Sequence, residues 1–149
     1  MSNDPGSNLT RRRFLARGAM AVSAAALPCI IPASVLGRGG AVPPSERIVM
    51  GGIGMGGRGS YDLSWMLTER DVQWVAVCDA LKSRREAAKN AVDGKYGNRD
   101  CAVYGDLRQF LAERTDVDAM LVATGDRWHA LASVYAMRAG KDVYCEKPA

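Results

Sequence analysis

The chain has 149 residues, of which 48% are hydrophobic and 24% are charged, and this composition is typical of one soluble globular domain. Its formal net charge of +4 lies in residues 1–40, which carry five arginines and one aspartate, whereas the rest carries 15 basic and 15 acidic residues. A nucleic-acid binder concentrates basic charge on its folded surface, so the charge distribution argues against a nucleic-acid partner.

The N-terminal segment resembles a bacterial export signal. Residues 10–15, TRRRFL, are similar to the twin-arginine pattern. The apolar run that follows, from about residue 19 to residue 31, is shorter than the ~20 residues of a membrane-spanning helix. We expect a twin-arginine signal, the twin-arginine translocase as a partner, and a periplasmic or other extracytoplasmic location. A disordered basic tail, a membrane anchor and a lipoprotein signal at Cys29 are the alternatives, although Pro28 does not suit a lipobox.

The segment boundaries follow from composition. We expect the signal peptide to span residues 1–36, a Gly- and Pro-rich linker to span 37–45, and the folded domain to span 46–149. Within the domain, short apolar runs typical of buried strands are predicted at residues 47–53, 71–79, 101–104, 117–124 and 142–146.

Helical patterns separate these strands. One helix is predicted from about residue 58 to 67, and two capping boxes, Ser83-x-x-Glu86 and Asp106-x-x-Gln109, predict the starts of two more. A fourth helix, ending at Gly140, is predicted to bury Leu131, Val134 and Tyr135. The alternation predicts an α/β fold with a doubly wound, Rossmann-like parallel sheet. We expect this sheet to be incomplete at its C-terminal end.

A glycine-rich turn joins the first strand to the first helix. Gly54-x-Gly56-x-x-Gly59 alone is weak evidence, but Asp79 ends the second strand 20 residues after the last glycine, as in dinucleotide-binding βαβ units. The predicted cofactor-binding residues here are Gly54, Met55, Gly56, Gly57, Arg58, Gly59 and Asp79. A carboxylate at residue 79 would bind ribose hydroxyls and repel a 2′-phosphate, so NAD is favoured over NADP. NADP stays an alternative because the nearby cations Lys82, Arg84 and Arg85 could offset this repulsion.

Cysteine and histidine contents predict neither a disulfide framework nor a metal site. Cys78, Cys101 and Cys145 remain beyond the signal and are widely spaced, and His129 is the only histidine.

Nearly the whole chain after Ser45 resembles the Gfo/Idh/MocA oxidoreductases, which include inositol dehydrogenases and glucose–fructose oxidoreductase. The motifs that carry the resemblance are GIGMGGRG, VCD and ATGDRWHALASVYAMRAGKDVYCEKP, and the last contains the family's Glu-Lys-Pro. The resemblance implies that Lys147 is catalytic and lies beside the nicotinamide, that Glu146 contacts the nicotinamide ribose, and that Thr124 and His129 line the cofactor. Gly125 stands where the family usually has proline, which makes the position of His129 less certain.

The resemblance also implies hydride transfer with a sugar or polyol substrate, and a second domain that supplies the substrate pocket. We therefore interpret the chain as the cofactor-binding half of an exported NAD(P)-dependent oxidoreductase, a C-terminal truncation that by itself is not expected to turn over substrate. A non-catalytic nucleotide-binding module or an inactive gene fragment is the alternative. The family often dimerises through the sheet of that second domain, so no oligomer is expected.

Overall fold

The computed structural model describes residues 42–147. The predicted signal peptide and the first part of the linker lie outside the described residues, and the rest of the linker leads into a short 3₁₀ helix, η2 (Pro44–Glu46). Within residues 42–147 no helix is long and apolar enough to span a membrane.

A single parallel sheet organises the described residues, and it confirms the predicted doubly wound α/β fold. Its strands lie in the order β3-β2-β1-β4-β5, and every neighbouring pair is parallel. The order in which strands are added therefore reverses at β1, which pairs with β2 on one side and β4 on the other. The strands are β1 (Ile48–Ile53), β2 (Val72–Cys78), β3 (Ala102–Tyr104), β4 (Ala119–Val122) and β5 (Asp142–Cys145).

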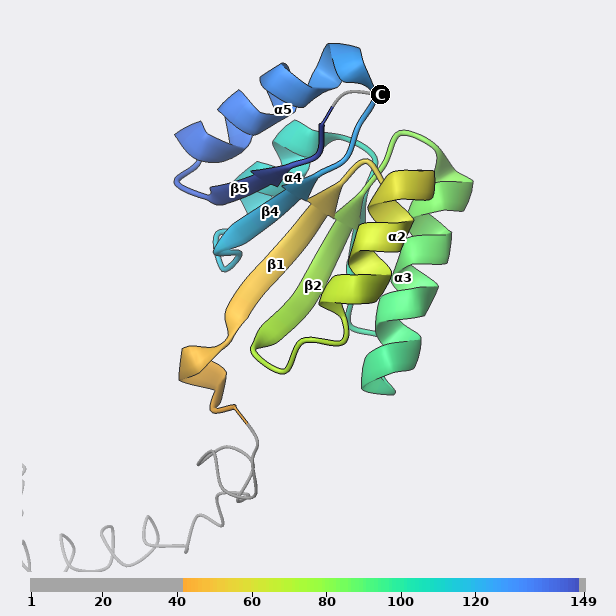
Figure 1. Ribbon diagram of the computed structural model, residues 1–149, viewed down its shortest axis with the longest axis vertical. Helices are drawn as coiled ribbons and strands as arrows, with labels where there is room; N and C mark the ends of the chain where they lie inside the picture. The colour runs from red at the N-terminus through yellow and green to blue at the C-terminus, as the bar shows by residue number, and fades with distance from the viewer. Residues whose placement is uncertain (1–41, 148–149) are drawn as a thin grey trace, which may run out of the picture. The chain divides into compact units, whose positions relative to one another are not determined.

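Helices cover both faces of the sheet. α2 and α3 lie side by side on one face, and α4 and α5 lie on the other (Figure 1). Along β4, Met120 and Val122 pack into the cluster beneath α4 and α5, whereas Leu121 packs into the cluster beneath α2 and α3. The alternation places one apolar core on each side of the strands. The helices are α2 (Gly57–Met66), α3 (Lys82–Tyr96), α4 (Leu107–Glu113) and α5 (Asp126–Arg138).

One of the two predicted capping boxes is wrong. α3 begins at Lys82 with Leu81 as its N-cap and no side-chain cap, so Ser83 lies inside the first turn. The helix starts earlier because Leu81 donates its amide to the Asp79 carboxylate, which already fixes the chain before the helix. The Asp106 cap on α4 is confirmed, since its side chain accepts a hydrogen bond from the Arg108 amide.

The predicted buried face of α5 is also wrong. Leu131, Val134 and Tyr135 are exposed by 43%, 38% and 38%, and the residues that face the sheet are His129, Ala132, Ser133 and Ala136. Small side chains let the helix approach the strands closely, and the larger ones are left on its outer sides. The sequence pattern does not separate the two faces because α5 carries apolar residues on both.

Candidate functional site

The carboxyl ends of the strands form the candidate site. In an open α/β sheet, ligands bind in the crevice where strand order reverses. That point lies here between β1 and β4, and the segments that follow both strands, together with those after β2 and β3, border a cleft of about 470 Å³.

The turn after β1 is shaped by close backbone contacts. Gly54 has φ of +87°, a conformation that disfavours side chains, and a Cβ there would lie 2.6 Å from the Thr124 backbone nitrogen. A Cβ on Gly59 would overlap the Gly54 carbonyl oxygen. Gly54 therefore permits the tight turn, and Gly59 permits close packing of the helix against the turn.

The start of α2 faces open space. A Cβ on Gly57 would meet nothing within 4 Å, and one on Gly56 would meet only the guanidinium of Arg84, at 3.3 Å. The Ser60 amide makes the first helical bond, to Gly56 O. The amides of residues 57–59 therefore lie in the unpaired first turn, where a helix binds anions.

Asp79 connects the second strand to the glycine turn. Its side chain is buried, with Oδ2 accepting from the Met55 amide at 2.8 Å and Oδ1 accepting from the Leu81 amide at 2.8 Å. Each carboxylate oxygen has a further lone pair for a ligand hydroxyl. Asp79 thus holds the turn in place while it lines the cleft.

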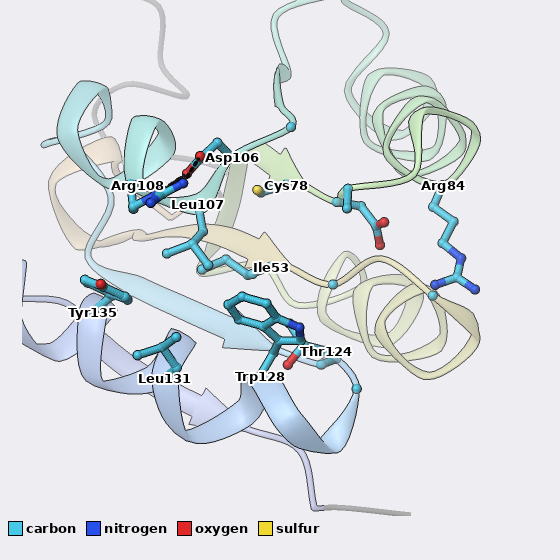
Figure 2. A pocket seen from close by; sticks show the side chains of 17 residues that line it. Ile53, Cys78, Arg84, Asp106, Leu107, Arg108, Thr124, Trp128, Leu131 and Tyr135 are labelled. Carbon is cyan, nitrogen blue, oxygen red and sulfur yellow. Dashed lines mark hydrogen bonds and ion pairs between the residues drawn. The ribbon is translucent and has the colours of Figure 1, made fainter.

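The cleft has a polar end and an apolar side. Figure 2 shows Trp128, Leu131 and Tyr135 in a row along α5, opposite Leu107 and Arg108 of α4. Arg84 extends from α3 toward the start of α2 (Figure 2). The complete lining is Ile53, Gly54, Gly56, Cys78, Asp79, Ala80, Arg84, Gly105, Asp106, Leu107, Arg108, Ala123, Thr124, Gly125, Trp128, Leu131 and Tyr135.

One buried side-chain atom of the lining lacks a partner within residues 42–147. Thr124 Oγ1 is buried and makes no hydrogen bond there. A buried hydroxyl without a partner costs about 1–3 kcal/mol, and in a cleft such a hydroxyl is available for a hydrogen bond to a ligand. Together with the open helix start and the Asp79 carboxylate, this hydroxyl fits a group that carries phosphates and sugar hydroxyls.

Glu146 and Arg58 form an ion pair outside the cleft lining. Arg58 Nη2 lies 2.8 Å from Glu146 Oε1 and 3.0 Å from Asp62 Oδ1, and both carboxylates are buried. The hydrogen bond from Arg58 lowers the pKa of Glu146. Burial raises the pKa of Asp62, an effect that Arg58 partly opposes. Both carboxylates are therefore directed at one guanidinium.

The other predicted residues also lie outside the cleft lining. Lys147 is exposed at the end of the described chain and donates its backbone amide to Glu146 Oε2 at 3.3 Å. The buried His129 faces β5, where its Nδ1 lies 3.5 Å from Cys145 Sγ. The Met55 side chain is in the core and contributes its amide instead. Their cofactor contacts stay predictions.

Comparison with known proteins identifies the family of this chain. The Gfo/Idh/MocA family model, described as an oxidoreductase family with an NAD-binding Rossmann fold, matches residues 47–149. The chain belongs to the Gfo/Idh/MocA family. The "Glycosyl hydrolase family 109 protein 1" of Bacteroides thetaiotaomicron is 38% identical over 110 residues, which cover 72% of this chain and 23% of that protein.

Solved structures of two inositol dehydrogenases have a similar fold over the matched part. Myo-inositol 2-dehydrogenase from Lactobacillus plantarum matches with a TM-score of 0.59 and 26% identity, over 68% of this chain and 28% of that one. Myo-inositol dehydrogenase from Lactobacillus casei, in complex with NAD(H) and myo-inositol, matches with a TM-score of 0.59 and 25% identity, over 68% and 29%. The chain thus spans about a quarter of the length of these relatives.

The structure brings together four of the predicted Gfo/Idh/MocA site residues, Gly54, Gly56, Asp79 and Thr124, in one cleft lining. Sequence reasoning did not assign the apolar side formed by Leu107 and the α5 side chains. The one available signal was the large side chains at positions 128, 131 and 135, three and four residues apart. No group of three or more metal-ligating side chains occurs within residues 42–147.

Two neighbouring glycines give a test of the turn. Gly54→Ala should lower the free energy of unfolding by about 1–3 kcal/mol, because alanine would be strained at a positive φ and would meet the Thr124 backbone. Gly57→Ala is the matched control, since its Cβ would lie in open space. Urea unfolding of both variants measures the difference, and equal stabilities would contradict the packing argument.

Proposed function

We propose that residues 47–149 bind NAD for an oxidoreductase that acts on a hydroxyl group of a sugar or polyol. The observation that carries the proposal is the convergence of an open helix start, a buried carboxylate and a partnerless buried hydroxyl on one cleft. Family membership and the NAD(H)-bound relative support the same interpretation.

Each part of NAD would bind to a different group of cleft residues. The first amides of α2 would bind the pyrophosphate, with Gly56 leaving room for its approach. Asp79 would accept hydrogen bonds from the adenosine ribose. The adenine ring would lie along the apolar side formed by Leu107, Trp128 and Leu131, because burial of an aromatic base against such side chains is favourable.

Lys147 is the proposed catalytic residue. When bound, the nicotinamide supplies the hydride acceptor for oxidation of an alcohol. Lys147 would position the substrate hydroxyl and assist its proton transfer, a task suited to an amine at the carboxyl end of a parallel strand. The Arg58–Glu146 pair, which fixes the residue before Lys147, would hold this backbone in place.

NAD binding tests the proposal, and Asp79 tests the choice of cofactor. Asp79→Asn loses the negative charge and one of the two side-chain oxygens that accept hydrogen bonds from backbone amides. The affinity for either cofactor should therefore fall. The ratio of NADP to NAD affinity should nevertheless rise. The corresponding change in relative binding free energy is about 1–3 kcal/mol, the scale of a hydrogen bond to a charged group. Calorimetry with both cofactors measures the ratio.

Arg84→Gln is the matched control, since it removes the cation beside Gly56 and leaves the tether between Asp79 and the turn intact. It should lower the NADP to NAD ratio or leave it unchanged. The proposal fails if NAD does not bind to the unmodified chain, and the assignment of NAD fails if NADP binds more tightly.

A second candidate activity is glycoside hydrolysis, which the name of the Bacteroides relative favours. NAD-dependent glycosidases exist, so the same cofactor site would serve either reaction. The third alternative is a non-catalytic nucleotide-binding module, which binds NAD but converts no substrate.

Assays with NAD and two probe substrates, myo-inositol and an aryl glycoside, separate these activities. The 149-residue chain spans about a quarter of its relatives, and hydride transfer needs the donor carbon held ~3–3.5 Å from the nicotinamide. We therefore expect NAD binding with neither reduced nicotinamide nor released aryl alcohol. Either product, if lost in Lys147→Ala, would contradict this expectation and identify the reaction.

We further propose export through the twin-arginine route, on the sequence of residues 10–15. Replacing Arg11 and Arg12 by lysine should retain the protein in the cytoplasm, because the translocase recognises the arginine pair. Cell fractionation of a tagged precursor measures the distribution. Equal export from a strain that lacks the translocase would refute the proposal.

A further inference from the structure

A thiol and an imidazole meet beside the carboxyl end of β5. Cys145 Sγ lies 3.5 Å from Nδ1 of His129, sixteen residues earlier in the chain. Cys145 is exposed, whereas His129 is 8% exposed on the face of α5 that packs on the sheet. Neither residue is among those that line the cofactor cleft.

The other two cysteines within residues 42–147 have a different environment. Burial, with a smaller contribution from the nearby Asp79 carboxylate, raises the pKa of Cys78 to about 12. Burial likewise raises the pKa of Cys101 to about 11. Both thiols are free but inaccessible, and they serve as internal references for the reactivity of Cys145.

We propose that Cys145 and His129 form a nucleophilic pair and that Cys145 is a modification site for hydroperoxides and related soft electrophiles. With its own proton on Nε2, His129 accepts the thiol proton at Nδ1. The sulfur then attacks one peroxide oxygen, so that an S–O bond forms and the O–O bond breaks. Sulfur is oxidised to sulfenic acid, the peroxide is reduced, and the departing oxygen takes the proton from the imidazolium.

A second acceptor also lies near the thiol. The Glu146 carbonyl oxygen is 3.4 Å from Cys145 Sγ and can accept a hydrogen bond from the neutral thiol. A carbonyl cannot take up the proton, however, and it would repel a thiolate. Only His129 can both remove the proton and then donate a hydrogen bond back to the sulfur, so the proposed reactivity depends on this ring.

Alkylation rates of individual cysteines test the pair. Iodoacetamide is the probe, and mass spectrometry of the peptides separates Cys145 from the other three cysteines. Cys145 should react at least about tenfold faster than Cys78 and Cys101, and His129→Phe should slow it by about fivefold or more, because the base that removes the thiol proton is lost. Ser133→Ala, which alters the same buried face of α5 one turn later, is the matched control and should leave the rate unchanged.

A measurement on the unmodified chain covers the case in which His129→Phe does not fold. The loss of the Cys145 thiol in hydrogen peroxide should be at least about tenfold faster than that of glutathione at the same pH. An equal or slower rate overturns the proposal, as does an unchanged alkylation rate in a folded His129→Phe variant. NAD binding is measured separately, so the outcome of this test does not depend on the proposed function.

Discussion

The close approach of the β1–α2 turn to the end of β4 is the constraint on which the site depends. Gly54 and Gly59 let the turn lie against the Thr124 backbone and let α2 lie against the turn, where any side chain would collide with backbone atoms. The amide of Met55, between them, is held by Asp79 from the end of β2. Three strands are thereby tied at one point, and this point is where the sheet reverses its strand order.

A consequence is that Asp79 has two tasks. Its carboxylate satisfies two backbone amides in a buried position and still presents acceptor capacity to the cleft. Cofactor selectivity and the shape of the glycine turn are therefore coupled in one side chain. A change of its charge alters both, which is why a ratio of affinities is more informative here than either affinity alone.

The opposite end of the site is organised by Arg58. This side chain lies in the first turn of α2 and reaches Glu146, 88 residues later, so it connects the helix that follows the glycine turn to the segment that follows β5. The buried Asp62 shares the same guanidinium. The family resemblance had assigned Glu146 to the nicotinamide ribose and Arg58 to the glycine turn, with no reason to expect contact between them. Their contact fixes the backbone on which Lys147 stands.

Much of the fold followed from the sequence by itself. The alternation of apolar runs with helical patterns determined the parallel sheet, and the spacing of Gly54, Gly56, Gly59 and Asp79 determined where its functional edge lies. These are local features, because glycine requirements and strand periodicity depend on neighbouring residues. Only the tertiary structure decided which face of α5 enters the cleft, that Glu146 turns toward Arg58, and that Cys145 meets His129. Each of these depends on partners distant in the chain or on how closely a helix packs against its sheet, and neither quantity is present in a local pattern.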